Sequence, residues 1–299
     1  VERMLLRDQL RPMSRPQVPN LVQVPERFRN PPADPGLRHC VPYTWAVTGL
    51  GVVSRRDLPG RDPDSLTALF PRDRPLAGDN PAPPQLVFAD DMRAVLGTAL
   101  RSMGLSASTR DPGELGRLRE LMRREGPRVV DIVNDVGGTL KAGRAPLGLG
   151  WSADITETST HDPQVRFVVP REGVLLFIDY ACVPRRSAQP ALAFAFLNHL
   201  LNPQIAAQVA NVQFYVAPNQ GSAPLLRMEA RALGGILDTL LANRRFEVPT
   251  DVGPALPTYQ EIWRELKAGV AARAAAQAAQ AAAPPSQAPR RPHRGSGHR

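Results

Sequence analysis

The sequence predicts a protein of the α/β class, and three observations support this prediction. Short segments rich in β-branched residues alternate with segments whose apolar residues recur at helical spacing. The chain has 299 residues, which suggests two domains or one larger one, since a domain commonly holds about 150 residues. Hydrophobic residues make up 42% of the chain, enough to bury a core. No apolar run approaches the roughly 20 residues of a membrane-spanning helix.

Four segments are expected to form strands because they are short and rich in Val, Ile and Phe. They are residues 85–88, 129–133, 165–169 and 174–178. The proline-rich segment 71–84 is expected to be a surface connection.

Helix starts are expected at four polar residues that can cap the first turn. They are Asp90, Asp111, Asn202 and Thr258. Asp111 and Asn202 are each followed by proline, which fits the first helical position. Thr258 is followed three residues later by Glu261, which fits a capping box. Gly104 and Gly126 are expected to end the first two helices.

The net charge of +9 is concentrated at the end of the chain. Of the 37 basic residues, six lie between 267 and 299, so the rest of the chain holds 31 basic against 28 acidic residues. A nucleic-acid-binding domain usually carries its basic residues on a folded face, so no nucleic-acid partner is expected. Residues 270–299 are expected to form a disordered tail of Ala, Pro and Arg, although the alanine run can extend the preceding helix as far as Pro284.

Motifs that would indicate an enzyme are absent from the sequence. It contains no P-loop, no nucleophile elbow and no metal-binding motif, and the glycine pairs at 49–51 and 148–150 do not continue into a dinucleotide-binding fingerprint. An isolated general base at His39, His161 or His199 stays an alternative, but ordinary core or surface histidines are the favoured interpretation. Neither an enzyme nor a cofactor is expected.

Two acidic residues stand close to aromatic residues in apolar surroundings. Asp154 follows Trp151 after a glycine-rich apolar approach, and Asp179 follows Phe177 at the end of an apolar run. Alternate residues of a strand share a face, so Phe177 and Asp179 are expected to point the same way. A carboxylate at the end of a buried strand needs a partner. That partner is either a ligand or, in the simpler interpretation, a turn or an arginine.

The two cysteines, Cys40 and Cys182, do not form a C-x-x-C pair, and the histidines are scattered, so a zinc site has no support. In an oxidising compartment they can form one disulfide.

Seven groups of motifs stand in order along residues 1–269. They are D-P-G with V-P-Y-T-W and T-G-L-G within 34–51, D-D-M-R at 90–93, G-W-S-A-D at 150–154, E-G with F-I-D within 172–179, N-H-L-L-N-P at 198–203, Y-V-A-P-N at 215–219, and D-V-G with the ending 259–269. Together they resemble the spermidine/putrescine-binding proteins, the solute-binding components of polyamine ABC importers.

The resemblance implies a type II periplasmic binding protein, with two α/β lobes joined by crossing hinge strands near 43–51 and 177–184. The first lobe would comprise residues 1–46 and 178–225, and the second 47–177 and 226–269. The chain is expected to lack the N-terminal βαβ unit of the first lobe, together with the signal peptide. If Thr44 pairs near Ile178 in the crossing strands, Cys40 falls near Cys182 and a disulfide would join the strands there.

The resemblance also implies the ligand residues. Trp151, Phe177 and Tyr215 match the family's aromatic positions, and Asp154 and Asp179 match its carboxylates. A further acid, used by some members, matches Asp91. Aromatic faces attract ammonium groups by about 0.5–2 kcal/mol per contact, and carboxylates accept charge-assisted hydrogen bonds from them.

Two positions depart from the family pattern. Ala94 stands where the family usually has glutamate, and Pro249 or Thr250 stands where it has glutamine. The pocket therefore offers fewer polar partners, which favours a shorter or differently charged ligand.

The expected protein is thus a monomeric periplasmic receptor for putrescine or spermidine that delivers its ligand to permease subunits. Two alternatives stay open: the same fold with another small cationic or zwitterionic solute, or a truncated remnant without function.

Overall fold

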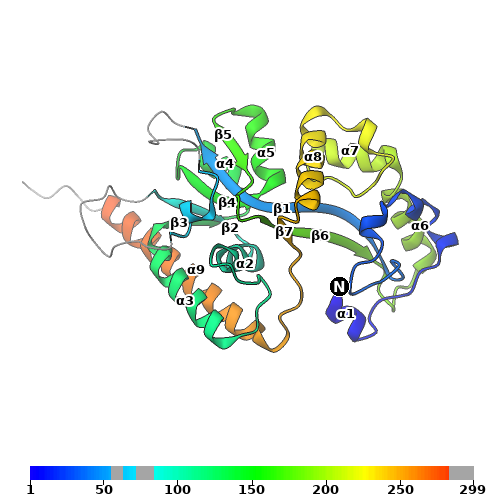
Figure 1. Ribbon diagram of the computed structural model, residues 1–299, viewed down its shortest axis with the longest axis horizontal. Helices are drawn as coiled ribbons and strands as arrows, with labels where there is room; N and C mark the ends of the chain where they lie inside the picture. Colours follow the sequence, from blue (N-terminus) through cyan, green and yellow to red (C-terminus); the bar gives the residue numbers. More distant parts are fainter. Residues whose placement is uncertain (55–62, 72–83, 283–299) are drawn as a thin grey trace, which may run out of the picture.

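The computed structural model describes residues 1–54, 63–71 and 84–282. Figure 1 shows two groups of elements joined by two long strands, β1 (Cys40–Val53) and β6 (Val174–Cys182). We call the group built on residues 48–168 and 250–282 the larger half, and the group built on 1–47 and 174–247 the smaller half.

The strands form one mixed sheet in the order β3-β2-β4-β1-β6-β7, with β5 also paired to β1. The remaining strands are β2 (Leu86–Ala89), β3 (Val129–Val133), β4 (Leu147–Trp151), β5 (Val165–Val168) and β7 (Phe246–Glu247). β2 is parallel to β3 and β4, whereas β1 is antiparallel to β4, β5 and β6. The four predicted strands are confirmed, with β6 longer than expected, while β4 was not predicted.

Helices cover both faces of the sheet in the larger half, as Figure 1 shows. Those of the larger half are α2 (Met92–Ser102), α3 (Pro112–Glu125), α4 (Val136–Lys141), α5 (Ser152–His161) and α9 (Leu256–Ala282). Those of the smaller half are α1 (Glu2–Leu6), α6 (Pro190–Leu200), α7 (Pro203–Gln213) and α8 (Met228–Ala242). Across the described ranges, none of the helices combines the length and the apolar character needed to cross a membrane.

Two of the predicted caps are confirmed: the Asp111 carboxylate accepts from the Glu114 N–H and the Asn202 side chain from the Gln204 N–H. The prediction for Asp90 was wrong by one residue, because Asp91 caps α2 and Asp90 instead binds Lys267 at 2.8 Å.

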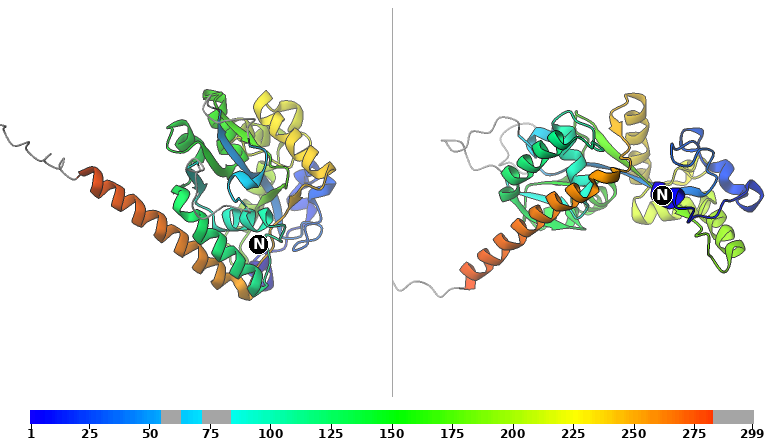
Figure 2. Two further views of the ribbon diagram at one scale, coloured as in Figure 1. Left: turned by 60° about the vertical axis from the view of Figure 1, so that its left-hand side comes forward. Right: turned by 90° about the horizontal axis from the view of Figure 1, so that it is seen from below.

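The prediction for α9 was wrong at its start, because the helix begins at Leu256 and Thr258 lies inside it. At its other end the alternative is confirmed: the alanine run extends the helix to Ala282, so residues 270–282 are helical rather than part of a disordered tail, since alanine has the highest helix propensity. Figure 2 shows the end of α9 projecting from the body. Residues 283–299, and 72–83 of the predicted surface connection, lie outside the described residues.

Each half has its own apolar core, and β1 contributes to both. Leu50 and Val52 of β1 are buried with side chains of α2, α3 and α9, whereas Val41 and Val47 are buried with side chains of α6, α7 and α8. The lobe boundaries stay a prediction, but the buried leucines of α8 favour placing residues 228–242 with the smaller half.

The two glycine pairs of the sequence face each other across β1 and β4. Gly49 is the partner of Gly150 and Gly51 the partner of Gly148. A Cβ atom at Gly51 would lie 2.5 Å from the Leu140 side chain of α4. The glycines therefore allow α4 and α5 to approach the sheet closely.

The disulfide between Cys40 and Cys182 is confirmed, with Cα atoms 4.4 Å apart. The expectation that Thr44 pairs near Ile178 is confirmed to within one residue, since its partner is Asp179. An irregularity between Pro42 and Thr44 absorbs the extra residue and restores the pairing of the cysteines.

We expect the disulfide to stabilise the protein substantially, because it joins cysteines 142 residues apart. Replacing both cysteines (Cys40→Ala, Cys182→Ala) should lower the free energy of unfolding by about 2–5 kcal/mol, measured by urea denaturation. Dithiothreitol should destabilise the original protein by a similar amount and leave the variant unchanged. Equal stability of the two proteins without reductant would contradict the prediction.

Candidate ligand site between the two halves

One edge of β1 places two of the candidate side chains. Thr44 is the register partner of Asp179, and Ala46 is the partner of Phe177. The hydroxyl of Thr44, which is only 3% exposed, donates to Asp179 Oδ2 at 3.1 Å. Thr44 lies within the V-P-Y-T-W motif, but the resemblance assigned it no role in the ligand site. Its contact, which orients an exposed carboxylate, was therefore not expected.

The same short stretch of β1 places the other two aromatic residues. Thr48 is the register partner of Trp151, the last residue of β4. The N–H of Trp45 donates to the carbonyl of Val216 at 3.1 Å, which brings Tyr215 beside β1. Residues 44–48 of β1 thus gather side chains that come from distant parts of the chain.

The rings of Trp151 and Phe177 meet edge to face, with centroids 5.0 Å apart and planes at 89°. This is a favoured geometry for aromatic pairs. Trp151 ends a strand of the larger half and Phe177 lies on β6, so the pair forms an apolar wall at the junction of the halves.

A hydrogen bond connects the halves directly. Asp154 lies in the first turn of α5, and its Oδ1 accepts from the Tyr215 hydroxyl at 3.1 Å. Tyr215 follows Phe214, whose left-handed backbone (φ 59°) ends α7 and turns the chain toward the junction.

The charge of Asp154 is poorly compensated. Burial raises the pKa of its carboxyl from 3.8 to about 6, the hydrogen bond from Tyr215 opposes this increase, and the negative charges of Asp135 and Glu157 add to it. The pKa of Tyr215 is raised by burial first, then by Asp154, with smaller contributions from Asp179 and Glu157. Asp135 and Glu157 were missed in the sequence because no motif marks them; their relevance comes from their position around Asp154.

Among the described residues, no lysine, arginine or histidine forms an ion pair with Asp154, Asp179, Asp135 or Glu157. Several acids elsewhere are paired with arginine, as Asp251 is with Arg3. The junction therefore holds a surplus of negative charge beside aromatic rings, an arrangement that suits a cationic ligand.

Asp91 stands apart from the other predicted residues. Its carboxylate caps α2 by accepting from the Ala94 N–H at 2.8 Å, and no described contact joins it to the other predicted residues. It lies beyond the end of β2, beside the end of β4, so it faces the same edge of the sheet. Its role in ligand binding stays a prediction.

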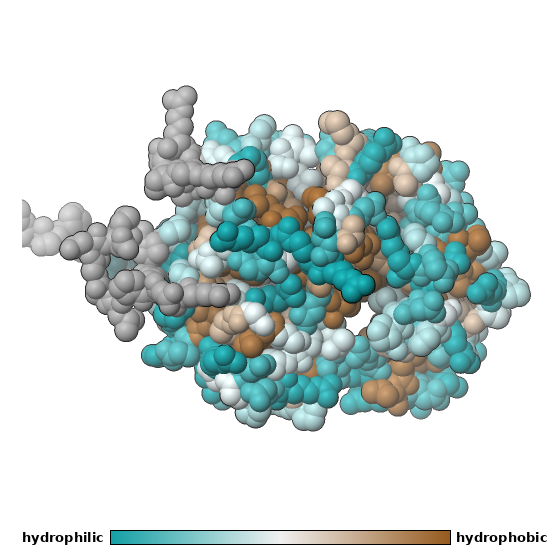
Figure 3. All heavy atoms as spheres, in the orientation of Figure 1, coloured by the Kyte–Doolittle hydropathy of each residue, from teal (hydrophilic) through white to brown (hydrophobic). Residues whose placement is uncertain are grey.

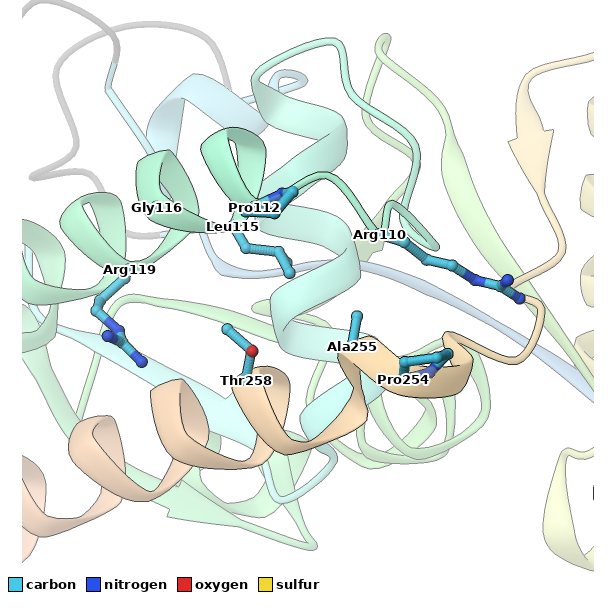
Figure 4. Close-up of a pocket in the computed structure, with 8 residues that line it drawn as sticks. All are labelled: Arg110, Pro112, Leu115, Gly116, Arg119, Pro254, Ala255 and Thr258. Atoms are coloured by element: carbon cyan, nitrogen blue, oxygen red, sulfur yellow. The ribbon is translucent and has the colours of Figure 1, made fainter.

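Two cavities are less suited to a cation, although Phe177 of the candidate site lines the first of them. One, of about 660 Å³, lies between the halves below the crossing strands, where Figure 3 shows an opening. Its lining acids are Glu2, Asp34 and Asp251. Glu2 accepts from the Asp251 N–H, Asp34 bonds backbone N–H groups and His39, and Asp251 pairs with Arg3. The other, of about 450 Å³, lies between α3 and α9 and has arginines but no acid in its lining (Figure 4).

Within the described ranges, no cluster of three or more His, Cys, Asp or Glu side chains is arranged to hold a metal ion.

Comparison with known proteins gives a consistent result. Residues 3–231 match the family described as bacterial extracellular solute-binding protein. The chain is 27% identical over 270 residues to the spermidine/putrescine-binding periplasmic protein of Salmonella typhimurium, covering 90% of this chain and 75% of that protein.

Two solved structures are also similar. A putative spermidine/putrescine ABC transporter protein from Listeria monocytogenes has a TM-score of 0.78 at 25% identity, covering 89% of this chain and 80% of that one. The PotD substrate-binding protein from Streptococcus pneumoniae has a TM-score of 0.73 at 23% identity, covering 90% and 81%, which shows a shared fold.

The raised pKa of Asp154 predicts a pH-dependent effect of removing its charge. Because the pKa is higher in the folded protein than the ordinary 3.8, folding favours the protonated carboxyl, and ionisation destabilises the fold as the pH rises from about 4 through 6. Asp154→Asn keeps an acceptor for Tyr215 without the charge. It should therefore be more stable than the original protein at pH 8.

Urea denaturation at pH 8 and pH 4 tests this prediction. The advantage of Asp154→Asn should disappear at pH 4, where the original carboxyl is also neutral. Glu120→Gln on α3 is a control, since Arg123 lowers the pKa of that exposed glutamate, and it should show no such gain at pH 8. A lower stability of Asp154→Asn at pH 8 would show that the carboxylate is well compensated.

Proposed function

The chain belongs to the family of bacterial extracellular solute-binding proteins and has their type II periplasmic-binding-protein fold, and on this basis we propose that it is the polyamine receptor of an ABC importer. Proteins of this family bind solutes for transport and are not enzymes. The proposal names the ligand class, its site and the partner.

The observation that carries the proposal is the group of carboxylates without cations beside the aromatic pair. A polyamine is a methylene chain with ammonium groups, so it needs acceptors for charge at intervals and apolar surface between them. Asp154 and Asp179 supply the acceptors, from α5 and β6 respectively. The rings of Trp151, Phe177 and Tyr215 would contact the methylenes.

Each residue has a separate role in this proposal. Asp179 accepts one ammonium group while the Thr44 hydroxyl holds its other oxygen in place. Asp154 accepts a second ammonium group in addition to, or in place of, the Tyr215 hydroxyl. An adjacent cation would lower the pKa of Asp154, so ligand binding near pH 6 should be accompanied by release of a proton.

The proposed length of the ligand follows from the acidic groups available around Asp91. The carboxylate of Asp91 caps α2 by accepting from the Ala94 N–H, and the side chain of Ala94 has no acidic group. This arrangement favours a short diamine such as putrescine over a longer triamine. Another small cationic or zwitterionic solute stays an alternative ligand.

We further propose that the two halves are the two lobes of the receptor, that the chain acts as a monomer, and that it delivers its ligand to permease subunits in the periplasm. The disulfide supports an oxidising compartment. The matched relative is a periplasmic protein by name.

Calorimetric titration of putrescine and spermidine tests the proposed ligand. Putrescine should bind saturably, and Asp179→Asn should weaken binding about tenfold or more, because a hydrogen bond to a charged group contributes about 1.5–3 kcal/mol. Glu120→Gln, which removes an exposed acid on α3, should bind normally.

Absence of heat with either amine, from protein shown to be folded by circular dichroism, would overturn the polyamine assignment. Normal binding by Asp179→Asn would overturn the site.

A further inference from the structure

β1 changes partners in the middle of its course, between Val47 and Thr48. Up to Val47 it pairs with β6, and from Thr48 it pairs with β4. The same step separates the two cores, since Val47 is buried in the smaller half and Leu50 in the larger.

Side-chain hydroxyls replace ladder hydrogen bonds at this step. The N–H of Leu175, on β6, donates to Thr48 Oγ1 at 3.1 Å, and the N–H of Val47 donates to Ser152 Oγ at 3.3 Å. Thr98 on α2 donates its hydroxyl to Thr48 Oγ1 at 3.3 Å. Thr48, Thr98 and Ser152 are each 2% exposed.

The elements around the step are closely packed. Leu175 lies against α2, where a Cβ atom at Gly97 would approach its side chain to 2.7 Å. Ser152 is the first residue of α5, and α5 contacts α8 of the smaller half. The hydroxyls of Thr98 and Ser152 therefore belong to helices of the larger half. The N–H groups of Val47 and Leu175, which donate to Ser152 and to Thr48, lie on the strands that lead to the smaller half.

A hydroxyl differs from a ladder carbonyl in a way that matters here. It sits on a side chain that rotates, and it accepts along two lone pairs, so it can follow or release a backbone N–H when the strand turns. A buried N–H that loses its acceptor is costly unless water reaches it. Whether the buried N–H groups of Val47 and Leu175 keep an acceptor therefore depends on the angle between the strands.

We propose that Thr48, Thr98 and Ser152 form the hinge of the molecule, and that their hydroxyls hold the halves in the arrangement seen here, with α5 against α8. Rotation of the halves breaks the bonds to Val47 and Leu175 and admits water to their N–H groups. The inference rests on the proposed two-lobed receptor, but its test needs no ligand.

Spin labels on the two halves report the arrangement directly. Arg123→Cys on α3 and Leu192→Cys on α6 are exposed sites on opposite halves (Figure 1). Both native cysteines are joined in the disulfide, so only the introduced cysteines react with the label. Distances between the labels are measured by pulsed electron paramagnetic resonance without ligand.

Thr48→Val removes the hydroxyl and keeps the shape of the side chain. It should shift the distance distribution toward larger separations, because the Leu175 N–H then finds an acceptor only in a hydrated, rotated arrangement. Amide exchange at Leu175 should accelerate at least tenfold relative to Val41, which lies within the undisturbed part of β1. Thr48→Ser, which restores the hydroxyl, should return both measurements to their original values.

A Thr48→Val protein with a lower melting temperature but an unchanged distance distribution would overturn the proposal. The hydroxyls would then stabilise the fold without determining the angle between the two halves. An unchanged exchange rate at Leu175 would do the same. Neither result depends on polyamine binding, so failure of the hinge and failure of the proposed ligand can be told apart.

Discussion

The antiparallel pairing of β1 with β6 is the constraint on which the rest of the structure depends. β1 runs through both cores, and the disulfide fixes its first residue to the last residue of β6. A slip of one residue would turn every side chain of the strand to the opposite face. Thr44 would then lose Asp179, and the partners that bring Phe177 and Trp151 together would separate.

Charge is the reason for proposing that a cation binds at this junction rather than in the cavity below the crossing strands. Several acids elsewhere in the described chain are paired with an arginine or lysine, as Asp251 and Asp90 are. Asp154 is instead half-buried among other acids, and burial alone makes its ionised form costly. In the proposed complex, an ammonium group supplies the missing counter-charge. Binding then removes the free-energy cost of ionising Asp154, and this gain adds to the affinity for the ligand. This is how a binding site can be destabilising for its own fold and still be retained.

Much of the fold could be predicted where local chemistry decides it, as at the caps Asp111 and Asn202. β4 could not, because its glycines lack the β-branched signature of a strand and serve instead to admit α4 and α5. The site residues came from motif resemblance, which names residues but does not show their contacts. Asp135 and Glu157 had no signal in the sequence, since their effect on Asp154 arises only from the folded arrangement.

The central claim is that Asp154 and Asp179 together bind a cation between the halves. Carbon-13 NMR of the aspartate carboxyl groups during a putrescine titration near pH 6 measures this most directly. The account predicts that the resonances of both carboxyls shift saturably with one dissociation constant, and that the pKa of Asp154 falls below its value of about 6 in the free protein. Saturable binding that leaves both resonances unmoved would contradict it and locate the ligand elsewhere.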